Sequence, residues 1–541
     1  MTSLWLDRGE SFTSDTFPAG DSYDTVVAGA GLTGLVTALL LARSGQKVLV
    51  LEARFPGAVT TGNTTAKVTL LQGTVLSGLS KHYSKKQLSA YVEANKEGQA
   101  WLLRYLDENN VPYQRRDAYT YATTASGADS VRAERDAATA GGLEVEYVRD
   151  AGLPFPVHGA VRLAAQAQIN PMQVLDTLLA DLRARGGTIV SGVRVRDVTA
   201  SSPATVHTDL GTVTTKEVVL ATGTPILDRG LYFAKLKPSR SYAAALELPA
   251  DQVPPPGMYI SVEQPTHSLR DYEADGRRLL LVGGHGHPVG RAKSEREHLS
   301  GLLQWAGEQF PGAVTTHTWS AQDYQPTSLM PFFGKLPRGR GHVYVGTGYN
   351  KWGMTNAVAA ALGISGDMLG GQLPWADTLR HHGPTASGAW STVALNAGVA
   401  AKLATDWGHV AASGGDGHKE QTTAAAGAQP DATGAPDTGM VPGADVESAG
   451  LETAGAGPQA AVEPAEGEGV VYREGVRPVA AATVNGTTCR LSAVCTHLGG
   501  IVHWNDNEMT WDCPLHGSRF NSDGTQLEGP ATKDLPPIEH V

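Results

Sequence analysis

Two cysteines and two histidines near the end of the chain set the strongest constraint on how it folds. They lie in two short segments, Cys495-Thr-His497-Leu-Gly-Gly and Cys513-Pro-Leu-His516-Gly-Ser518, and fifteen residues separate His497 from Cys513. Cysteine and histidine two positions apart can both point inward from one loop, and Cys-Pro-x-His can form a second loop that faces the first. Thiolates and imidazoles are ligands of iron–sulfur clusters and of structural zinc ions. The sequence therefore predicts that Cys495, His497, Cys513 and His516 bind a metal centre.

The pattern Cys-x-His followed by Cys-x-x-His resembles the Rieske family, whose [2Fe–2S] cluster has two cysteines on one iron and two histidines on the other. The flanking Leu498-Gly-Gly, Pro514 and Gly529-Pro530-Ala531 also resemble Rieske loops. This resemblance implies a small all-β domain that carries one electron at a time. It also implies that His497 and His516 lie on the exposed edge of the cluster. The alternative is a structural zinc site with mixed ligands, although zinc ribbons usually use Cys-x-x-Cys pairs.

The cluster loops depart from those of respiratory Rieske proteins at three places. Those proteins often join a second cysteine pair as a disulfide, whereas this chain has Gly500 and Leu515 there. The serine that can donate to a cluster sulfur is retained as Ser518, but Phe520 replaces the respiratory tyrosine. Loss of a hydrogen-bond donor and of the disulfide makes reduction harder. We therefore expect a lower reduction potential than in respiratory Rieske proteins.

A dinucleotide-binding pattern lies near the start of the chain. The apolar run 24–28 precedes Gly29-Ala-Gly31-Leu-Thr-Gly34, a helix-forming stretch covers 35–43, and a second apolar run over 46–51 ends at Glu52. Glycines let the backbone approach a pyrophosphate, the following helix offers free N–H groups, and the acid can accept hydrogen bonds from ribose hydroxyls. A Gly-rich strand–helix turn without a ligand is the alternative, but it leaves Glu52 without a role.

Two further segments indicate that the dinucleotide is FAD. Val218-Val-Leu-Ala-Thr-Gly223 reads as a strand that returns beside the first one, and the segment 341–355 reads as a third piece of the same domain. Together these pieces resemble the D-amino-acid oxidase/glycine oxidase family of FAD-dependent amine oxidoreductases. The Gly-rich loop before the expected last helix can aim N–H groups at the flavin, where negative charge gathers on reduction, and a plain turn from strand to helix is the alternative. The expected FAD-binding residues are Gly29, Gly31, Gly34, Glu52, Thr65, Thr222, Gly223, Gly348, Gly353, Met354 and Thr355.

Candidates for catalysis come from the same resemblance and from residue type. Lys67 follows a segment of small and hydroxylated residues that is expected to run under the flavin, although a solvated lysine is the common alternative. Tyr349, Lys351 and Trp352 lie in the loop that we place at the flavin. His285 and His287, at alternate positions of a Gly-His-Gly-His loop, could face the substrate together, although a polar turn is the more common reason for such a pair.

The expected architecture is an α/β FAD-binding, Rossmann-like domain with an inserted α+β substrate domain, plus a small C-terminal all-β Rieske domain. The oxidoreductase would cover 1–407 and the Rieske domain 470–541. Within the first, the nucleotide-binding parts are expected near 20–80, 165–225 and 335–405, and the substrate-facing parts near 85–160 and 225–330. Residues 408–469 are rich in Ala, Gly, Pro and acids; between 411 and 468 there are ten acidic residues and one lysine. Such a segment buries too little apolar surface to fold, so we expect a disordered linker.

Composition excludes several classes of function. The net charge of −11 argues against nucleic acid as a partner, and no apolar run approaches the length of a membrane span. The three cysteines leave Cys489 as a single thiol beside the two expected ligands. With no signal-like start, this predicts a cytoplasmic, reducing compartment.

The expected function is FAD-dependent oxidation of an amine, amino acid or related C–N substrate. Electrons would pass from the reduced flavin to the Rieske [2Fe–2S] cluster and then to an external acceptor. In one alternative the electrons flow in the opposite direction, from the cluster to the flavin, for a reductive or oxygen-activating step. Another is a redox sensor or electron carrier that turns over no small molecule.

Overall fold

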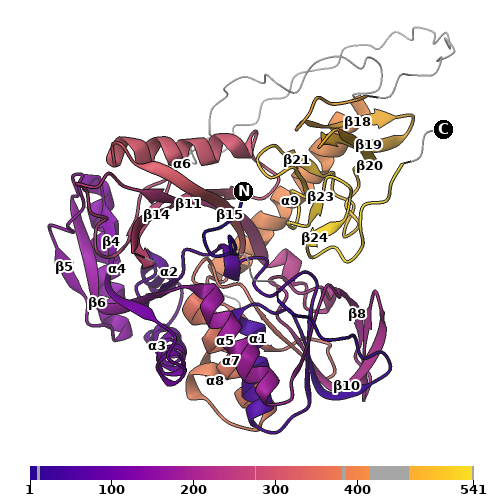
Figure 1. Cartoon of the computed structure of the whole chain (residues 1–541), viewed down its shortest axis with the longest axis horizontal. Helices are drawn as coiled ribbons and strands as arrows, with labels where there is room; N and C mark the ends of the chain where they lie inside the picture. The colour runs from indigo at the N-terminus through magenta and orange to yellow at the C-terminus, as the bar shows by residue number, and fades with distance from the viewer. Residues whose placement is uncertain (9–11, 275, 381–385, 413–461, 539–541) are drawn as a thin grey trace, which may run out of the picture.

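A computed structural model describes the chain except residues 9–11, 275, 381–385, 413–461 and 539–541. The described chain forms a nucleotide-binding body, a second body built on a large curved sheet, and a small C-terminal β body that sits on both (Figure 1). Most of the expected linker, 408–469, falls in the segment outside the description. Among the described residues, no helix has the length and apolarity that a membrane crossing requires.

The nucleotide-binding body contains a mainly parallel sheet with the order β16-β17-β10-β1-β2-β7. Its central strand, β1, pairs in parallel with β2 and β10, and the apolar residues Val26 and Val27 are fully buried because both faces of the sheet are covered. An antiparallel hairpin, β8–β9, extends β10. The strands are β1 (Ser22–Ala28), β2 (Val48–Glu52), β7 (Thr188–Ser191), β8 (Val195–Thr199), β9 (Ala204–Thr208), β10 (Gly211–Leu220), β16 (Phe332–Lys335) and β17 (Val343–Thr347).

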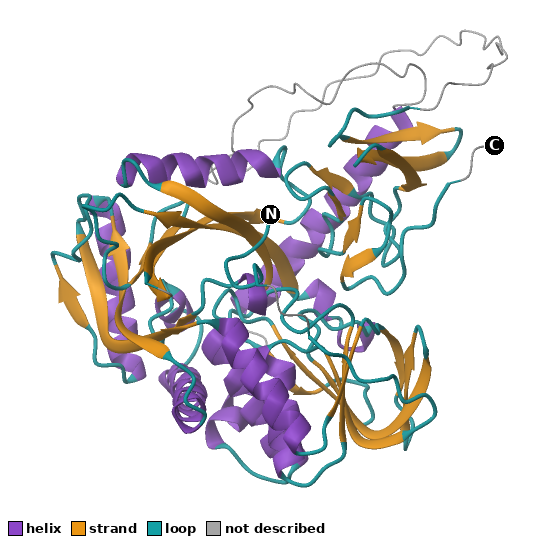
Figure 2. Cartoon of the chain, in the orientation of Figure 1, coloured by secondary structure: helices purple, strands orange, loops and turns teal. Residues whose placement is uncertain are grey.

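Helices cover one face of this sheet. Helix α1 packs against both α5 and α7 (Figures 1 and 2). Helix α3 packs against α7, and α8 packs against α3. Asn170 caps α5 by accepting from the Met172 N–H at 3.0 Å, directly before the Pro171 that starts the helix. The helices are α1 (Leu32–Arg43), α3 (Lys85–Glu108), α5 (Pro171–Ala184), α7 (Gly353–Met368) and α8 (Pro374–Arg380).

The second body is built on a nine-stranded sheet with the order β15-β11-β14-β13-β12-β4-β6-β3, to which β5 adds beside β6. Alternate residues of β11 face opposite sides: Ala243 and Ala245 join the core shared with α1 and α7, whereas Ala244 and Leu246 pack under α6. The strands are β3 (Lys67–Val68), β4 (Tyr113–Ala122), β5 (Glu146–Val148), β6 (Gly159–Ile169), β11 (Leu236–Glu247), β12 (Met258–Ser261), β13 (His267–Ala274), β14 (Arg277–Pro288) and β15 (Val314–Pro326), with helices α2 (Val75–Ser80), α4 (Ala125–Gly141) and α6 (Glu295–Gln309).

The C-terminal β body consists of two small antiparallel sheets around the fully buried Trp511 and Phe520. Helix α9 (Ala386–Ala412) runs five residues past the expected end of the first domain at 407, and its Val410 belongs to the core of this β body. The strands are β18 (Gly469–Glu474), β19 (Arg477–Val484), β20 (Thr487–Ser492), β21 (His503–Asn505), β22 (Thr510–Asp512), β23 (Arg519–Asn521) and β24 (Gln526–Glu528), and the short 3₁₀ turns are η1 (Thr61–Asn63), η2 (Asp228–Gly230) and η3 (Tyr232–Ala234).

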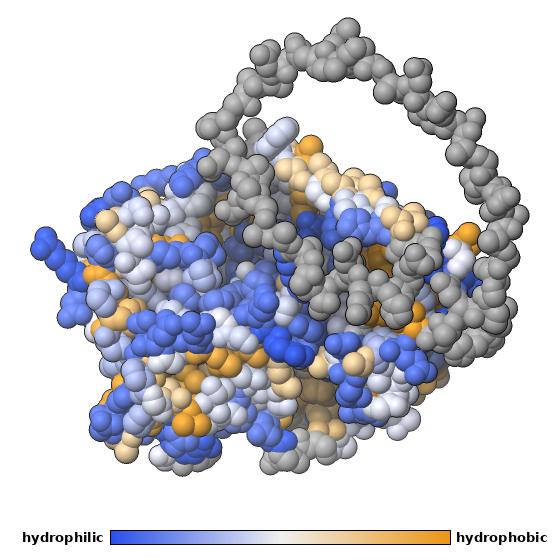
Figure 3. Space-filling model, turned by 90° about the horizontal axis from the view of Figure 1, so that it is seen from above, coloured by the Kyte–Doolittle hydropathy of each residue, from blue (hydrophilic) through white to orange (hydrophobic). Residues whose placement is uncertain are grey.

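The surface seen in Figure 3 mixes hydrophilic and hydrophobic residues. Among the described residues, the buried apolar side chains form four cores, one of which holds the C-terminal β body together with part of α9. This arrangement joins the β body to the rest of the chain through packing as well as through the covalent linker.

Candidate functional site

The turn after β1 forms one wall of a deep cavity, which we call the dinucleotide cavity. Gly29 has a φ of +105°, and a Cβ there would lie 2.4 Å from the carbonyl oxygen of Ala221, so the position requires glycine. A Cβ on Gly34 would lie 1.9 Å from the carbonyl oxygen of Gly29. Gly34 thus lets α1 pack against the turn, and the first residues of α1, together with Gly29 and Gly31, line the cavity.

Glu52 ends β2 and faces the same cavity. Its Oε2 accepts from the Ala30 N–H and its Oε1 from the Arg54 N–H, each at 2.9 Å. Burial raises the pKa of Glu52, and these two hydrogen bonds oppose that shift. Arg194 lies in the lining of the same cavity, so the expected ribose-binding acid is held in a fixed rotamer with a cation nearby.

The N-terminus of α7 closes another side of the cavity, where Gly353 and Met354 line it. The Thr355 hydroxyl donates to Asn95 at 2.6 Å and accepts from Gln72 at 3.1 Å. This buried polar network fixes the start of the helix. Its free N–H groups and positive dipole end therefore face the cavity, where they can stabilise negative charge.

The structure brings most of the expected cofactor residues together. Of the expected residues, the cavity is lined by Gly29, Gly31, Glu52, Thr222, Gly223, Gly348, Tyr349, Lys351, Gly353 and Met354. Six others lie outside this lining: Gly34, Thr65, Lys67, His285, Trp352 and Thr355. Their neighbours Leu32, Thr33 and Thr64 take part in the lining instead.

The residues outside the lining have identifiable surroundings. His285 packs against Gly301 of α6 and its ring lies 3.2 Å from that of His267, Nε2 to Nε2, on the α6 side of the large sheet. Trp352 is the N-cap residue of α7. Lys67 is buried on β3, where burial and then the charge of Arg270 lower its pKa to about 7. Lys67 is therefore readily neutral at physiological pH, although it does not line the cavity.

Asp323 and Lys351 are neighbouring residues in the cavity wall. The Lys351 backbone N–H donates to the Asp323 carboxylate. Asp323 is half-buried and Lys351 is exposed, and desolvation by the surrounding protein raises the pKa of Asp323 and lowers that of Lys351. The Tyr349 hydroxyl lies 3.0 Å from the Thr33 hydroxyl. The cavity therefore holds titratable groups shifted towards their neutral forms, as proton transfer requires.

The second site lies in the C-terminal β body, where two similar loops face each other. In one, the Cys495 N–H donates to Gly500 at 2.8 Å; in the other, the Cys513 N–H donates to Ser518 at 2.8 Å. The Cys513 thiol donates to the Cys495 sulfur and lowers the pKa of Cys495, and the Ser518 hydroxyl donates to the same sulfur. Both thiols are buried.

The two imidazoles of this site lie beside each other, with the rings of His497 and His516 5.1 Å apart. Phe233 of η3 covers them, its ring centroid 5.2 Å from that of His497 and 5.0 Å from that of His516. Asp228 of η2 lies 3.1 Å from His497, Oδ1 to Nε2. The expectation of an exposed edge is therefore wrong in this docked arrangement, because the N-terminal part of the chain packs directly against both rings.

The chemistry of this site fits a [2Fe–2S] cluster better than a single zinc ion. Two thiols pair on one side and two imidazoles on the other, and among the described residues no three His, Cys, Asp or Glu side chains converge on one ion position. A Cβ on Gly500 would lie 2.6 Å from the Leu515 side chain, so Leu515 fills the space over Gly500 where a second cysteine pair would sit. The three cysteines are free thiols.

The two sites share a wall. Gln526, Leu527, Glu528 and Gly529 of the C-terminal β body line the dinucleotide cavity, and the Arg194 guanidinium donates to the Gln526 carbonyl at 2.8 Å. A buried ion pair fastens this contact. Glu508 accepts from Arg240 of β11 at 2.5 Å and from Arg519 at 2.8 Å. Burial alone would raise the pKa of Glu508, but the two arginines lower it well below its ordinary value.

The family model that matches residues 24–365 is described as FAD dependent oxidoreductase, DAO, and this range covers more than half of the chain. The chain belongs to this family. A second model, the Rieske [2Fe-2S] domain, matches residues 451–539. The protein is therefore an FAD-dependent oxidoreductase with a Rieske domain, and the expected FAD and [2Fe–2S] cofactors are confirmed, as is the expected fold class.

Similar proteins share this organisation or parts of it. A Bacillus subtilis (strain 168) protein named as a Rieske 2Fe-2S iron-sulfur protein, YhfW, is 28% identical over 95% of this chain and 93% of its own length. The cytochrome b6-f complex iron-sulfur subunit of Microcystis aeruginosa is 49% identical over 45 residues, a quarter of that subunit. Glycine oxidase from Geobacillus kaustophilus has a TM-score of 0.56 at 18% identity, covering 67% of this chain and 99% of its own.

L-Proline dehydrogenase from P. horikoshii is also similar, with a TM-score of 0.54 at 15% identity over 66% of this chain and 96% of its own. At this identity the likeness to the solved structures establishes the fold alone.

Sequence reasoning missed several residues of the two sites: Arg194, Asp228, Phe233, Asp323, Tyr324 and the segment 526–529. These residues reach the sites through tertiary packing and belong to no local motif, so no signal in the sequence marks them.

Proposed function

We propose that this protein oxidises an amino acid or another amine at its FAD, and that the electrons leave through the Rieske cluster to an external acceptor. One observation carries the proposal: residues 526–529 of the Rieske domain line the same cavity as the dinucleotide motif. A cluster domain that completes the wall of the flavin site is placed to receive its electrons. The names of two structural neighbours, glycine oxidase and L-proline dehydrogenase, support an amino-acid substrate.

Bound FAD would accept the hydride from the substrate, and residues of this chain would hold the cofactor in place. We assign the pyrophosphate to the turn Gly29–Gly34 and the N-terminus of α1, and the ribose hydroxyls to Glu52. Thr222, Gly223 and Gly348 complete the walls. Gly353 and Met354 present the free N–H groups of α7, which stabilise the negative charge of reduction.

We assign to Lys351 and Asp323 the removal of the proton that an ammonium substrate must lose. An amine gives up a hydride only from its neutral form, so a base must take that proton first. Desolvation lowers the pKa of Lys351, which favours its neutral form, and its position in the cavity wall lets it reach a substrate there. We assign Tyr349 to positioning, since its hydroxyl is already held by Thr33 at 3.0 Å. Lys67, with a pKa of about 7, is a second candidate base.

Cys495, His497, Cys513 and His516 are assigned as the cluster ligands. Two hydrogen bonds connect the loop of His516 with the dinucleotide cavity. The Gln322 amide donates to the Gly517 carbonyl at 2.8 Å and to the Tyr324 hydroxyl at 2.9 Å, and Tyr324 lines the cavity. Because Gly517 directly follows His516 in the chain, these two hydrogen bonds connect the proposed ligand His516 with the wall of the dinucleotide cavity.

An anaerobic screen tests the substrate class. The holoprotein is mixed with single amino acids and simple amines, and the oxidised flavin absorbance is followed. We expect at least one amino acid or amine to bleach the flavin, and Lys351→Met to slow that bleaching at neutral pH while leaving FAD bound. Flavin that stays oxidised with every C–N compound, yet is reduced when the cluster is reduced first, would contradict the proposal and reverse the current.

A further inference from the structure

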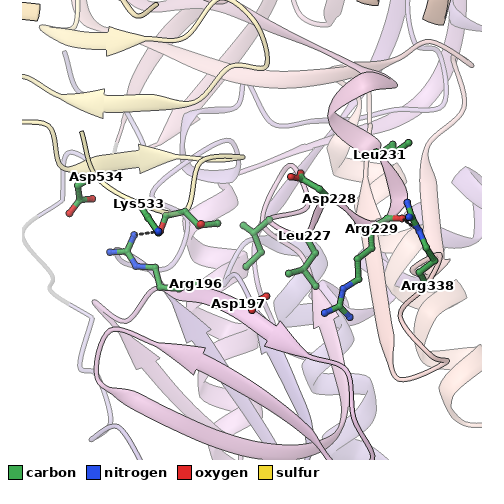
Figure 4. Close-up of a pocket in the computed structure, with 11 residues that line it drawn as sticks. Arg196, Asp197, Leu227, Asp228, Arg229, Leu231, Arg338, Lys533 and Asp534 are labelled. Atoms are coloured by element: carbon green, nitrogen blue, oxygen red, sulfur yellow. Dashed lines mark hydrogen bonds between the residues drawn. The ribbon is translucent and has the colours of Figure 1, made fainter. Parts of the chain in front are cut away.

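A second cavity lies at the junction of the FAD and Rieske domains, and we call it the junction cleft (Figure 4). Its volume is about 940 Å³, within the range of small-molecule sites. At one end of the cleft the Arg196 guanidinium donates to the Thr532 carbonyl at 2.7 Å. The lining residues are Arg196 and Asp197 of β8, Ile226, Leu227, Asp228, Arg229 and Leu231 of the η2 region, Arg338, and Thr532, Lys533 and Asp534 of the Rieske domain.

The junction cleft touches the cluster loop at two points. Asp228 contacts His497, Oδ1 to Nε2, at 3.1 Å. The Lys533 carbonyl accepts from the Thr496 hydroxyl at 2.7 Å, and Thr496 lies between the proposed ligands Cys495 and His497. Only the side chain of Asp228 therefore separates a molecule in this cleft from the proposed cluster ligand His497. Such a molecule reaches that position from outside, without entering the dinucleotide cavity.

The cleft lining carries four cationic and three anionic side chains, so positive charge exceeds negative charge by one. The Arg229 guanidinium donates to the Val198 carbonyl and the Arg338 guanidinium to the Arg229 carbonyl, each at 2.8 Å, so both partners are neutral. Within the described chain, neither arginine nor Lys533 forms an ion pair. Of the three lining carboxylates, Asp228 contacts His497, Asp534 accepts from the Gln526 N–H at 2.9 Å, and Asp197 accepts from the Val198 N–H at 2.7 Å.

Apart from its charged side chains and Thr532, the cleft is lined by apolar residues. Ile226, Leu227 and Leu231 contribute this surface, and Leu231 is 48% exposed. An exposed leucine beside three cations without acidic partners suits a flat, apolar ligand with a negative group at its edge.

We propose that the junction cleft binds the external electron acceptor, and that this acceptor is an anionic, quinone-type aromatic small molecule. This inference rests on the proposed exit of electrons through the cluster. In each step one electron leaves the reduced cluster, which is oxidised, and the bound quinone gains it. Two such steps and two protons from solvent complete the reduction to the quinol. Arg229, Arg338 and Lys533 hold the anionic group, and the leucines hold the ring.

The test starts from chemically reduced holoprotein, so that it does not depend on any substrate. The full chain is reduced with dithionite, freed of excess reductant, and mixed rapidly with 1,2-naphthoquinone-4-sulfonate or with neutral 1,2-naphthoquinone. Loss of the paramagnetic signal of the reduced cluster gives the rate. Binding is measured separately, by calorimetry with the redox-inert 2-naphthalenesulfonate.

The variants are Lys533→Glu and Arg338→Glu, with Arg340→Glu as the matched control. Arg340 is an exposed arginine two positions from Arg338 and outside the cleft lining. We expect a saturable rate with the sulfonated quinone that falls at least tenfold in both cleft variants and less than twofold in the control. Naphthalenesulfonate binding should weaken in parallel, and the neutral quinone should change less.

Three results would overturn the proposal: a rate that does not saturate, cleft variants that behave like wild type, or an equal loss in Arg340→Glu. The last would mean general electrostatic attraction to the surface, as for an acidic protein partner. If the cluster reacts as expected here but is not reduced by a substrate that bleaches the flavin, the proposed function fails while the cleft assignment stands.

Discussion

The carboxylate of Asp228 and the imidazole of His497 meet across the junction between the FAD and Rieske domains, with Oδ1 3.1 Å from Nε2. The contact fixes the ring of His497 and leaves Nδ1 as the nitrogen that can ligate iron. A carboxylate bonded to a metal-ligating histidine makes that ligand more basic and stabilises the more positive state of the metal centre. Domain docking and cluster chemistry are therefore coupled through this pair.

Replacing Asp228 with asparagine should raise the midpoint potential of the cluster. The amide keeps the size of the side chain but removes the negative charge that favours the oxidised cluster. We expect a rise of roughly 60 mV, which corresponds to about 1.4 kcal/mol for a one-electron couple. Potentiometric titration of the paramagnetic signal checks this, with Asp209→Asn, a solvent-facing partner of Arg196, as the control. An unchanged midpoint would mean that the contact does not influence the cluster.

The wild-type midpoint should lie below that of respiratory Rieske proteins. Phe520 is fully buried and has no hydroxyl to donate, and Leu515 packs over Gly500 in place of a disulfide. Ser518→Ala should lower the midpoint further, because the Ser518 hydroxyl donates to the Cys495 sulfur. Phe520→Tyr should raise it. Potentiometric titration of the paramagnetic signal measures these midpoints. A wild-type midpoint as high as in a respiratory complex would refute the prediction.

Arg240→Met should loosen the Rieske domain and weaken retention of FAD. Arg240 is 3% exposed and pairs with Glu508 across the junction, and removing one partner of a buried pair costs about 3 kcal/mol or more. Because residues 526–529 line the dinucleotide cavity, undocking also opens the flavin site.

Hydrogen exchange in β24 and the flavin content after gel filtration measure these two effects of Arg240→Met. Arg8→Met is the control, since the Arg8–Asp176 pair is partly solvent-exposed and should contribute about 1 kcal/mol or less. Full flavin content together with faster exchange in β24 would show that the Rieske domain adds nothing to FAD binding.

Glu295→Gln should stabilise the protein at alkaline pH. Burial, followed by the neighbouring Asp512 and Asp506, raises the pKa of Glu295 to about 8. Since the unfolded value is lower, the free energy of unfolding falls as pH rises between about 4.5 and about 8, and changes no further above that. The variant lacks this loss, so it should be more stable than wild type by about 1–3 kcal/mol at pH 8.5 and equal to it near pH 4. Chemical unfolding at the two pH values gives the difference; an equal gain at both would exclude ionisation as the cause.

The local motifs made both cofactor sites predictable, because each motif carries its own geometry. Gly29, Gly31 and Glu52 are placed by a strand, a turn and a helix that follow one another in the sequence. Spacing likewise set the Cys495 and Cys513 loops opposite each other. Their hydrogen bonds are local, so tertiary packing changes them little.

The junction could not be predicted in this way. Phe233 covers His497 and His516 although more than 260 residues separate them in the sequence, and the long linker allowed both a docked and a free Rieske domain. His285 was a candidate to face the substrate, with a polar turn as the alternative; it lies where the β11–β14 register shifts, and its ring packs against α6. A one-residue change of register reverses the face of a strand residue, and no local signal specifies it.

Anaerobic rapid mixing of the holoprotein with a bleaching substrate follows the electrons directly. The flavin absorbance and the paramagnetic signal of the cluster are recorded in the same reaction, for wild type, for Cys513→Ser and for the matched control Cys489→Ser, whose thiol lies outside the proposed ligand set. We predict that the flavin is reduced first and the cluster afterwards in wild type and Cys489→Ser, and that Cys513→Ser shows flavin reduction alone. A cluster that stays oxidised while the flavin is fully reduced, or one that is reduced before the flavin, would contradict the proposed path of electrons.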